Sequence, residues 1–394
     1  MNWKQNYWIV FILILSAASL AGELANNKFH TLDFEVYYKT TTRMLHQAEL
    51  YSIAEDGHYV YKYSPVAGLY FIPFALLNYP AAAALYWILL TVLLIAGLKV
   101  FYTLLDETDS QRKRNSISVV LILSLLTIGV HVHREWHLGQ VNLLLLVTYI
   151  FMIRAYTKRQ LLLFAALLSF SIFIKPFALI FLPYLVYKKQ WLTIVYSLAF
   201  TLILAFSPLI LYPSLTKVSH LYQSWQNELA VELSAKQNLL ADANHTIFSV
   251  VARYTPIKFM LTTALSQKIY QLIVLVLIGI GFLFFSLRQR KKEATLNEFS
   301  FLIALIPLLA FTSENAFIFE LPVIIILTYH FKLLSLIQKA LFITGCVLIG
   351  ANIYDIVGSE ISAFFISISI YTFGAILFMV LLTTKKCKPS NRLN

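Results

Sequence analysis

Long apolar runs dominate this sequence and determine the solvent in which it can fold. A helix needs about 20 mostly apolar residues to cross a bilayer. Hydrophobic residues make up 59% of the 394-residue chain and charged residues only 13%, with a mean hydropathy of +0.73. A soluble domain carries about 25% charged residues, so a soluble enzyme and a DNA-binding protein are excluded. We predict an all-α polytopic membrane protein with about twelve transmembrane helices, in the runs 7–22, 64–78, 81–104, 116–131, 139–156, 161–187, 191–212, 268–287, 296–312, 316–331, 337–354 and 360–383.

Two polar stretches, 23–63 and 213–267, interrupt these runs. Each is short for an independent domain, so we expect both to pack onto a single membrane domain that covers 1–394. Within the first stretch, residues 34–51 place apolar side chains at helical spacing. Such an amphipathic helix can lie on a membrane surface. The first apolar run lacks a small-residue cleavage site beside it, and we interpret it as a retained signal anchor.

Basic residues predict the orientation of the chain in the membrane. Sixteen of the 31 Lys and Arg lie in five short segments, and the rule that basic loops stay in the cytoplasm therefore places both long loops outside. Lys4 and the basic C-terminal tail agree. The net charge of +12 is explained in the same way, and no nucleic acid is expected as a partner. These segments are 106–115, 154–160, 188–189, 288–293 and 385–394.

One of these basic segments conflicts with a simple count of crossings. If 64–78 and 81–104 each cross the membrane, Arg112 and its basic neighbours lie outside. The conflict disappears if 64–104 crosses once and 161–187 crosses twice. Lys175-Pro176 in the middle of the second run favours a break between two short helices. The alternative is that both runs behave simply and two basic loops violate the charge rule.

The first polar loop contains Asp33 and Glu35 among aromatic residues, about ten residues beyond the first helix. A carboxylate in such an interfacial setting can act as a general base on a substrate hydroxyl. Asp33 can equally be the N-cap of the amphipathic helix that follows. The local sequence leaves both interpretations open.

Four tyrosines close the first loop: Tyr51, Tyr59, Tyr61 and Tyr63. Aromatic residues at this position suit a belt at the level of the lipid headgroups. They also suit a sugar-binding platform, because aromatic rings pack on the apolar faces of sugars. Both interpretations remain open from the sequence.

Polar residues between two apolar runs mark a second unusual region. His131, His133 and His137 lie close to Arg134 and Glu135, and such groups are costly in lipid unless they have partners. The histidines can in principle bind a metal ion, but their spacing matches no known motif, and we expect a structural ion pair and no metal. Further on, Gln140 and Asn142 open the next helix, where they can hydrogen-bond a hydroxylated ligand.

Lys175 stands alone in an apolar run. A lone cation in such a run is a functional candidate, and a phosphate at the membrane surface is the obvious ligand. The alternative is that its ammonium reaches out to the headgroups. Cys346 and Cys387 suggest neither a disulfide nor a thiolate metal site.

The second loop and a later turn add candidate ligands. Asn244 and His245 precede Arg253, whose guanidinium can clamp a phosphate through two hydrogen bonds. Glu314 and Glu320 lie near lipid and need partners.

Together these motifs resemble glycosyltransferase family 87, the polyprenol-phosphate-mannose-dependent α-mannosyltransferase-like proteins of the GT-C superfamily. The resemblance runs over nearly the whole chain, and its specificity lies in the order of motifs that are individually weak. Where the family often has Asn-Gln-Ser this chain has Asn244-His245-Thr246, and Ser313-Glu314-Asn315 replaces a Trp/His-rich turn, which leaves the sugar and the acceptor open. The matching motifs are Asp33-Phe34-x-x-Tyr37-Tyr38, Leu50-Tyr51, Tyr61-x-Tyr63-Ser64-Pro65, Phe71-x-Pro73-Phe74, Gly139-Gln140-Val141-Asn142-Leu143-Leu144, Lys175-Pro176-Phe177, Leu182-Pro183 and Arg253.

The resemblance implies a GT-C-like fold and an inverting membrane hexosyltransferase without a cofactor. By this resemblance Asp33 is the catalytic base. The implied partners are a polyprenyl-phosphate-sugar donor, expected to carry mannose, a glycolipid or glycan acceptor, and membrane lipid. The implied location is the bacterial cytoplasmic (inner) membrane, with the active site on the external, periplasmic side. The expected substrate-binding residues are Lys175, Arg253, Asn244, His245, Gln140, Asn142, Tyr63 and Glu314.

Two other functions remain as alternatives. A lipid-linked glycan polymerase or ligase also handles lipid-linked glycans outside the membrane, but the acidic tract directly after the first helix fits a GT-C enzyme better. A transporter or flippase is expected to show repeated halves and charged residues along a pathway. The sequence has no internal repeat, and its charges other than Lys175 lie mainly at predicted helix ends.

Overall fold

The computed structural model describes residues 6–29, 31–57, 59–108, 116–236, 238–289 and 291–384. Within these ranges the chain is helical and contains no strand. Lys4, Arg112 with its basic neighbours in 109–115, and the basic tail 385–394 lie outside the described residues.

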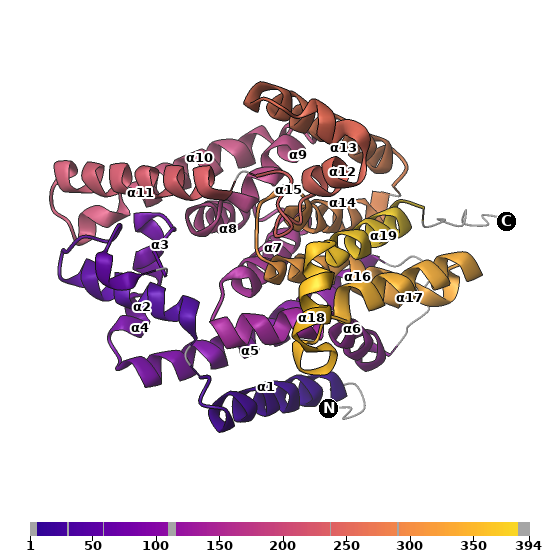
Figure 1. Cartoon of the computed structure of the whole chain (residues 1–394), viewed down its shortest axis with the longest axis horizontal. Coiled ribbons are helices and arrows are strands. Elements are labelled where there is room, and N and C mark those ends of the chain that lie inside the picture. The colour runs from indigo at the N-terminus through magenta and orange to yellow at the C-terminus, as the bar shows by residue number, and fades with distance from the viewer. Residues whose placement is uncertain are drawn as a thin grey trace. The chain divides into compact units, whose positions relative to one another are not determined.

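The chain divides into two compact units. The Asp33 unit comprises Ile9–Val100 and Val132–Asn238. Within it, α8 packs against both α7 and α10, and α2 packs against α3 and α4 (Figure 1). Its helices are α1 (Tyr7–Ala25), α2 (Leu32–Leu45), η2 (Ala54–Asp56), α3 (Pro65–Tyr70), α4 (Ile72–Ala75), most of α5 (Tyr79–Thr108), the end of α6 (Ile117–Leu138), α7 (Asn142–Thr157), α8 (Leu161–Ile174), η3 (Pro176–Ile180), α9 (Phe181–Tyr187), α10 (Trp191–Ala205), η4 (Ser207–Ile210) and α11 (Leu215–Lys236).

The Arg253 unit comprises Met1–Trp8, Phe101–His131 and Leu239–Asn394. Within it, α17 packs against α19, and α14 contacts α16 and α19 (Figure 1). Besides the end of α5 and the start of α6, its helices are α12 (Ile247–Tyr254), η5 (Pro256–Met260), α13 (Ala264–Leu287), α14 (Lys291–Ala304), α15 (Ile306–Leu309), η6 (Glu314–Glu320), α16 (Leu321–Tyr329), η7 (Phe331–Leu333), α17 (Leu336–Gly350), α18 (Tyr354–Ser367) and α19 (Ile370–Thr384).

Five of the described helices are long and apolar enough to cross a membrane, and the bent pair α18–α19 is a possible sixth span with a 61° bend. The chain is thus a multi-pass helical membrane protein, but the expected count of about twelve spans is not confirmed. Several of the predicted runs break because a proline cannot continue a helix. Pro73, Pro176, Pro208, Pro307 and Pro322 each lie in the first turn of a new short helix.

The run 161–187 breaks where the sequence predicted, between Ile174 and Pro176. Lys175 adopts an extended backbone conformation (φ −140°, ψ 134°), because the residue before a proline is sterically pushed away from helical geometry. The two parts, Leu161–Ile174 and Pro176–Tyr187, are both shorter than about 20 residues, so their lengths do not support two full crossings. In the run 64–78, α3 and α4 have six and four residues and cannot span a membrane either.

Gly139 ends α6 and allows α2 to approach it closely. Its φ is +64°, and the N–H groups of Gly139 and Gln140 bond to the carbonyls of Trp136 and Glu135. This is the pattern of a Schellman helix end, which favours glycine. A Cβ at this position would lie 2.6 Å from Phe34 Cβ. The connection between α6 and α7 therefore depends on a residue without a side chain.

We expect Gly139→Ala to destabilise the folded protein by about 2 kcal/mol or more, since the left-handed backbone costs about 1–2 kcal/mol and the contact with Phe34 adds overlap. Gly129→Ala is the matched control, because Gly129 lies within α6, ten residues before Gly139, and a Cβ added there would meet no atom within 4 Å. Thermal unfolding in detergent measures both. Equal stability of the two variants would contradict the close approach.

Candidate functional site

Asp33 lies in the first turn of α2, and its carboxylate meets the connection between α6 and α7. The N-cap of α2 is Thr31, not Asp33, so the capping interpretation of Asp33 is wrong. Asp33 Oδ2 accepts a hydrogen bond from Gln140 Nε2 at 2.6 Å. Gln140 Oε1 in turn accepts one from the backbone N–H of Val141. The amide of Gln140 is therefore fixed with its donor side facing the carboxylate.

Aromatic side chains surround this carboxylate. Phe34, the next residue along α2, is fully buried and stacks on Tyr86 with ring centroids 4.5 Å apart. The Tyr86 hydroxyl donates to the backbone carbonyl of Gln140 at 3.2 Å. Tyr86 thus packs against α2 through Phe34 and also holds Gln140, the residue that bonds Asp33.

Burial raises the pKa of the Asp33 carboxyl, because a charged group loses its hydration in an apolar setting. The hydrogen bond from Gln140 opposes this shift, as do the positive charges of Lys175 and Lys62. A carboxylate with a raised pKa is a better proton acceptor than an exposed one. The environment of Asp33 therefore suits a general base.

Lys175 projects from the break between α8 and η3. Its Nζ donates to Asn142 Oδ1 at 2.8 Å. It also lies 5.9 Å from the ring centroid of Tyr63 and 5.5 Å from that of Phe177, distances at which a cation is attracted to an aromatic face. Ser64, which caps α3, donates to the carbonyl of Phe173 at 2.7 Å and so fixes the segment of Tyr63 beside this lysine.

The tyrosines of the first loop mostly point into the protein. Tyr51 and Tyr61 are buried, and Tyr63 shares a hydrogen bond with the Tyr37 hydroxyl at 3.0 Å. Burial raises the pKa of both Tyr37 and Tyr63, so their hydroxyls remain protonated. Only Tyr59 of the four is exposed, at 53%. The four residues therefore do not form a continuous belt at the membrane surface.

The three histidines of α6 do not act together. His133 and His137 lie on one face of the helix, and both approach Glu23, with His137 Nδ1 at 2.8 Å from its carboxylate. His131 points elsewhere and bonds the carbonyl of Ile349. His133 and His137 thus share Glu23 as a carboxylate partner, which is an ion pair only where a ring is protonated. In the residues that the structure covers, no group of three metal-binding side chains converges.

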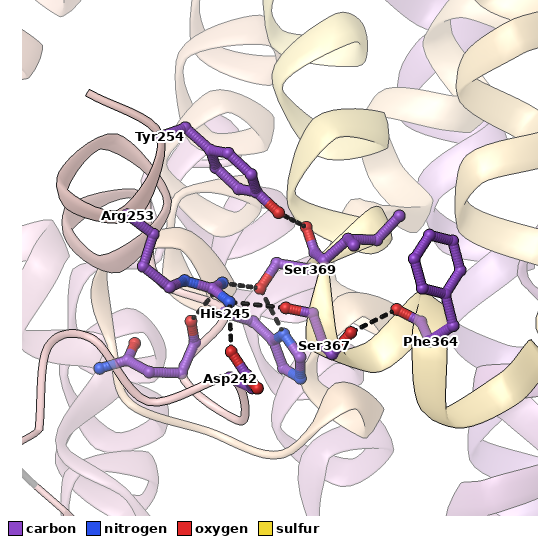
Figure 2. Close-up of polar contacts among 9 residues, drawn as sticks. Asp242, His245, Arg253, Tyr254, Phe364, Ser367 and Ser369 are labelled. Carbon is purple, nitrogen blue, oxygen red and sulfur yellow. Dashed lines mark hydrogen bonds and ion pairs between the residues drawn. The ribbon is translucent and has the colours of Figure 1, made fainter. Parts of the chain in front are cut away.

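Arg253 holds the bend between α18 and α19 in its own unit (Figure 2). Its Nη1 donates to the Ser367 carbonyl at 2.6 Å, and its Nη2 bonds the hydroxyl of Ser369 and, at 3.4 Å, the Asn244 carbonyl. Asp242 approaches Nη1 at 3.3 Å. Both terminal nitrogens are thus engaged by residues of this unit. The phosphate contact expected of Arg253 from the sequence stays a prediction.

Asn244 and His245 belong to the same cluster. Asn244 Oδ1 accepts hydrogen bonds from the N–H and the hydroxyl of Thr246, the N-cap of α12. His245 Nδ1 shares a hydrogen bond with Ser369 at 3.0 Å (Figure 2). Glu314 begins η6, three residues before Phe317, whose ring lies 6.4 Å from that of His245.

The candidate residues thus fall into two sets. Asp33, Tyr63, Gln140, Asn142 and Lys175 meet in the Asp33 unit. The other set, Asn244, His245, Arg253 and Glu314, lies in the Arg253 unit. The first set combines a partly buried carboxylate with a nearby ammonium and is the better candidate for chemistry.

Comparison with known proteins identifies the class of this chain. Residues 61–312, more than half of the chain, match the model of glycosyltransferase family 87. The match includes Lys175 and both residues that contact the two charged groups, Gln140 and Asn142, but begins after Asp33. No curated protein and no solved structure matches the chain.

The protein is therefore a membrane glycosyltransferase of the GT-C type. Specifically, the chain belongs to glycosyltransferase family 87. The resemblance seen in the sequence motifs is confirmed at the level of the family.

We expect Arg253→Met to lower the free energy of unfolding in detergent by about 2–4 kcal/mol. Hydrogen bonds from a charged group to partly buried acceptors contribute about 1.5–3 kcal/mol each, and their losses are not fully additive. Asp242→Asn is the control, since the Asp242 side chain is 74% exposed and that of Arg253 only 10%. An exposed ion pair contributes little. Arg253→Met with the stability of wild type and lost donor binding would favour the phosphate clamp instead.

Proposed function

We propose that this enzyme transfers a sugar, with mannose as the expected one, from a polyprenyl phosphate to an acceptor hydroxyl. The reaction takes place at the outer face of the bacterial cytoplasmic membrane. One observation carries the proposal: Asp33 and Lys175 are held in one unit by Gln140 and Asn142, two residues apart at the start of α7. A base and a cation are thereby supported by one short segment.

In this mechanism Asp33 takes the proton of the acceptor hydroxyl. The acceptor oxygen then forms a bond to the anomeric carbon, while the bond from that carbon to the phosphate oxygen breaks. Attack from the face opposite the phosphate inverts the configuration of the sugar. The electron pair of the broken bond leaves with the polyprenyl phosphate.

Lys175 supplies the complementary charge. Departure leaves negative charge on the phosphate, and a preorganised cation in a poorly hydrated site stabilises such charge strongly. Phosphate leaves without needing a proton, so one carboxylate is sufficient. Glycoside hydrolysis differs, because most hydrolases use a second carboxylic acid to protonate the leaving oxygen.

Lys175 is a better phosphate ligand than Arg253 in this proposal. An ammonium has three donors, and among the described residues the only hydrogen bond of Lys175 Nζ is to Asn142. Arg253 has both terminal nitrogens engaged with residues of its own unit. Tyr63, whose ring faces the Lys175 ammonium, supplies a neutral contact for the sugar. The acceptor is a glycolipid or a glycan, reached from the membrane.

Asp33→Asn is expected to reduce transfer from polyprenyl-phosphate-mannose by at least about a hundredfold, because general-base assistance contributes about 10²–10⁴. The assay follows labelled sugar into lipid-extract acceptors in proteoliposomes. Glu35→Gln is the matched control: Glu35 lies two residues away, partly exposed, and pairs with Lys39, so its loss should change the rate less than about threefold. Full transfer by Asp33→Asn would remove Asp33 from the mechanism.

Gln140→Met should shift the acidic limb of the pH–rate profile to higher pH. The hydrogen bond from Gln140 lowers the pKa of Asp33, so its removal raises that pKa and leaves less of the deprotonated base at a given acidic pH. The rate at higher pH should recover in part. Measurement of kcat/KM against pH for wild type and both Gln140→Met and Glu35→Gln tests this, and a shift to lower pH would contradict it.

A further inference from the structure

Glu135 is a fully buried carboxylate near the end of α6. Its Oε1 accepts a hydrogen bond from Asn142 Nδ2 at 2.8 Å, and its Oε2 accepts one from the backbone N–H of Leu143 at 2.8 Å. The first N–H groups of a helix have no partner within it and carry partial positive charge. Glu135 therefore satisfies the start of α7 while also engaging the side chain of Asn142.

These contacts fix the orientation of the Asn142 amide. An amide group donates from its nitrogen and accepts at its oxygen, whereas an ionised carboxylate only accepts. With Nδ2 committed to Glu135, Oδ1 must face the other way, and there it accepts from Lys175 Nζ at 2.8 Å. The two accepting oxygens of Glu135 thus determine which end of Asn142 meets the lysine.

The position of Lys175 depends on this contact. The lysine stands at a helix break, where its backbone is extended, and lysine has a long and flexible side chain. The rings of Tyr63 and Phe177 also face its ammonium, and a ring attracts a cation without fixing the direction of its donors. The charges of Glu135, Asp33 and Lys62 act on it as well, but they are not directional hydrogen bonds. Among the described residues, Asn142 is therefore the contact that orients the ammonium.

We propose that Glu135 is a positioning residue: it fixes the amide of Asn142, and this amide holds the Lys175 ammonium where it meets the phosphate of the donor. The inference rests on the proposed function of Lys175. Gln140 lies between Glu135 and Asn142 in the chain and contacts Asp33. The segment 135–142 therefore positions both the Asp33 carboxylate and the Lys175 ammonium.

Exchange of the carboxylate and the amide provides a specific test. In Glu135→Gln, an NH₂ group replaces one carboxylate oxygen and faces a donor, so Asn142 must turn its oxygen toward residue 135 and its NH₂ toward Lys175. In Asn142→Asp, two carboxylates face each other. The double variant Glu135→Gln/Asn142→Asp restores every donor–acceptor pair and keeps the net charge of wild type.

Two readouts are measured for each variant: binding of polyprenyl phosphate to the purified protein, and transfer kinetics with separate KM values for donor and acceptor. Glu135→Gln should weaken polyprenyl phosphate binding by at least about tenfold and lower kcat/KM for the donor by about 10²-fold. The KM of the acceptor should stay within about threefold. The double variant should recover both donor values to within about fivefold of wild type.

The variant Lys175→Met tests whether Glu135 acts through the lysine. If Glu135 acts only by placing Lys175, Glu135→Gln has no further effect on donor binding in the Lys175→Met background. A general structural role would instead lower the thermal stability and would lower kcat/KM for the donor and for the acceptor alike. It would also persist without the lysine.

The outcomes separate the proposed function from the role of Glu135. Wild type that binds no polyprenyl phosphate overturns the proposed function and the role of Glu135 with it. Wild type that binds and transfers while Glu135→Gln binds equally well overturns the role of Glu135 alone. If Glu135→Gln does not fold, a folded double variant with wild-type donor binding supports the exchange, and a folded double variant with lost binding contradicts it.

Discussion

The hydrogen bond between Gln140 and Asp33 joins two parts of the chain that lie 107 residues apart. It exists because α6 ends in a left-handed glycine, which turns the chain and lets α2 lie against the turn. The same turn leads directly into Asn142 and α7. One helix end therefore carries both Gln140, which bonds the partly buried Asp33 carboxylate, and Asn142, which bonds the partly buried Lys175 ammonium.

The carboxylate of Asp33 and the ammonium of Lys175 affect each other's electrostatics. Each is costly to bury alone, and each reduces the cost of the other. The charges of Lys175 and Lys62 oppose the effect of burial on the pKa of Asp33, which keeps the carboxylate available as a proton acceptor. The arrangement suits a reaction in which an acceptor loses a proton while a phosphate leaves with negative charge.

Sequence reasoning predicted the helical membrane class, the family and the break at Lys175. It did not predict how many runs are interrupted. The mean hydropathy of a run stays high across a single proline, although prolines such as Pro208 and Pro307 lie at the start of new short helices. It proposed Arg253 as a phosphate ligand, and it gave no sign of the backbone carbonyls that this guanidinium meets in the structure. It noted that Glu135 needs partners, but only the fold brings it to Asn142.

The central claim is that the donor phosphate binds Lys175 with the sugar facing Asp33. Cryo-electron microscopy of the full-length protein with a non-transferable polyprenyl-phosphate-sugar analogue tests it most directly. We expect phosphate density within hydrogen-bonding distance of Lys175 Nζ and the anomeric carbon on the side of Asp33. Phosphate density bound to Arg253, with Lys175 still on Asn142 and no ligand near it, would contradict this claim.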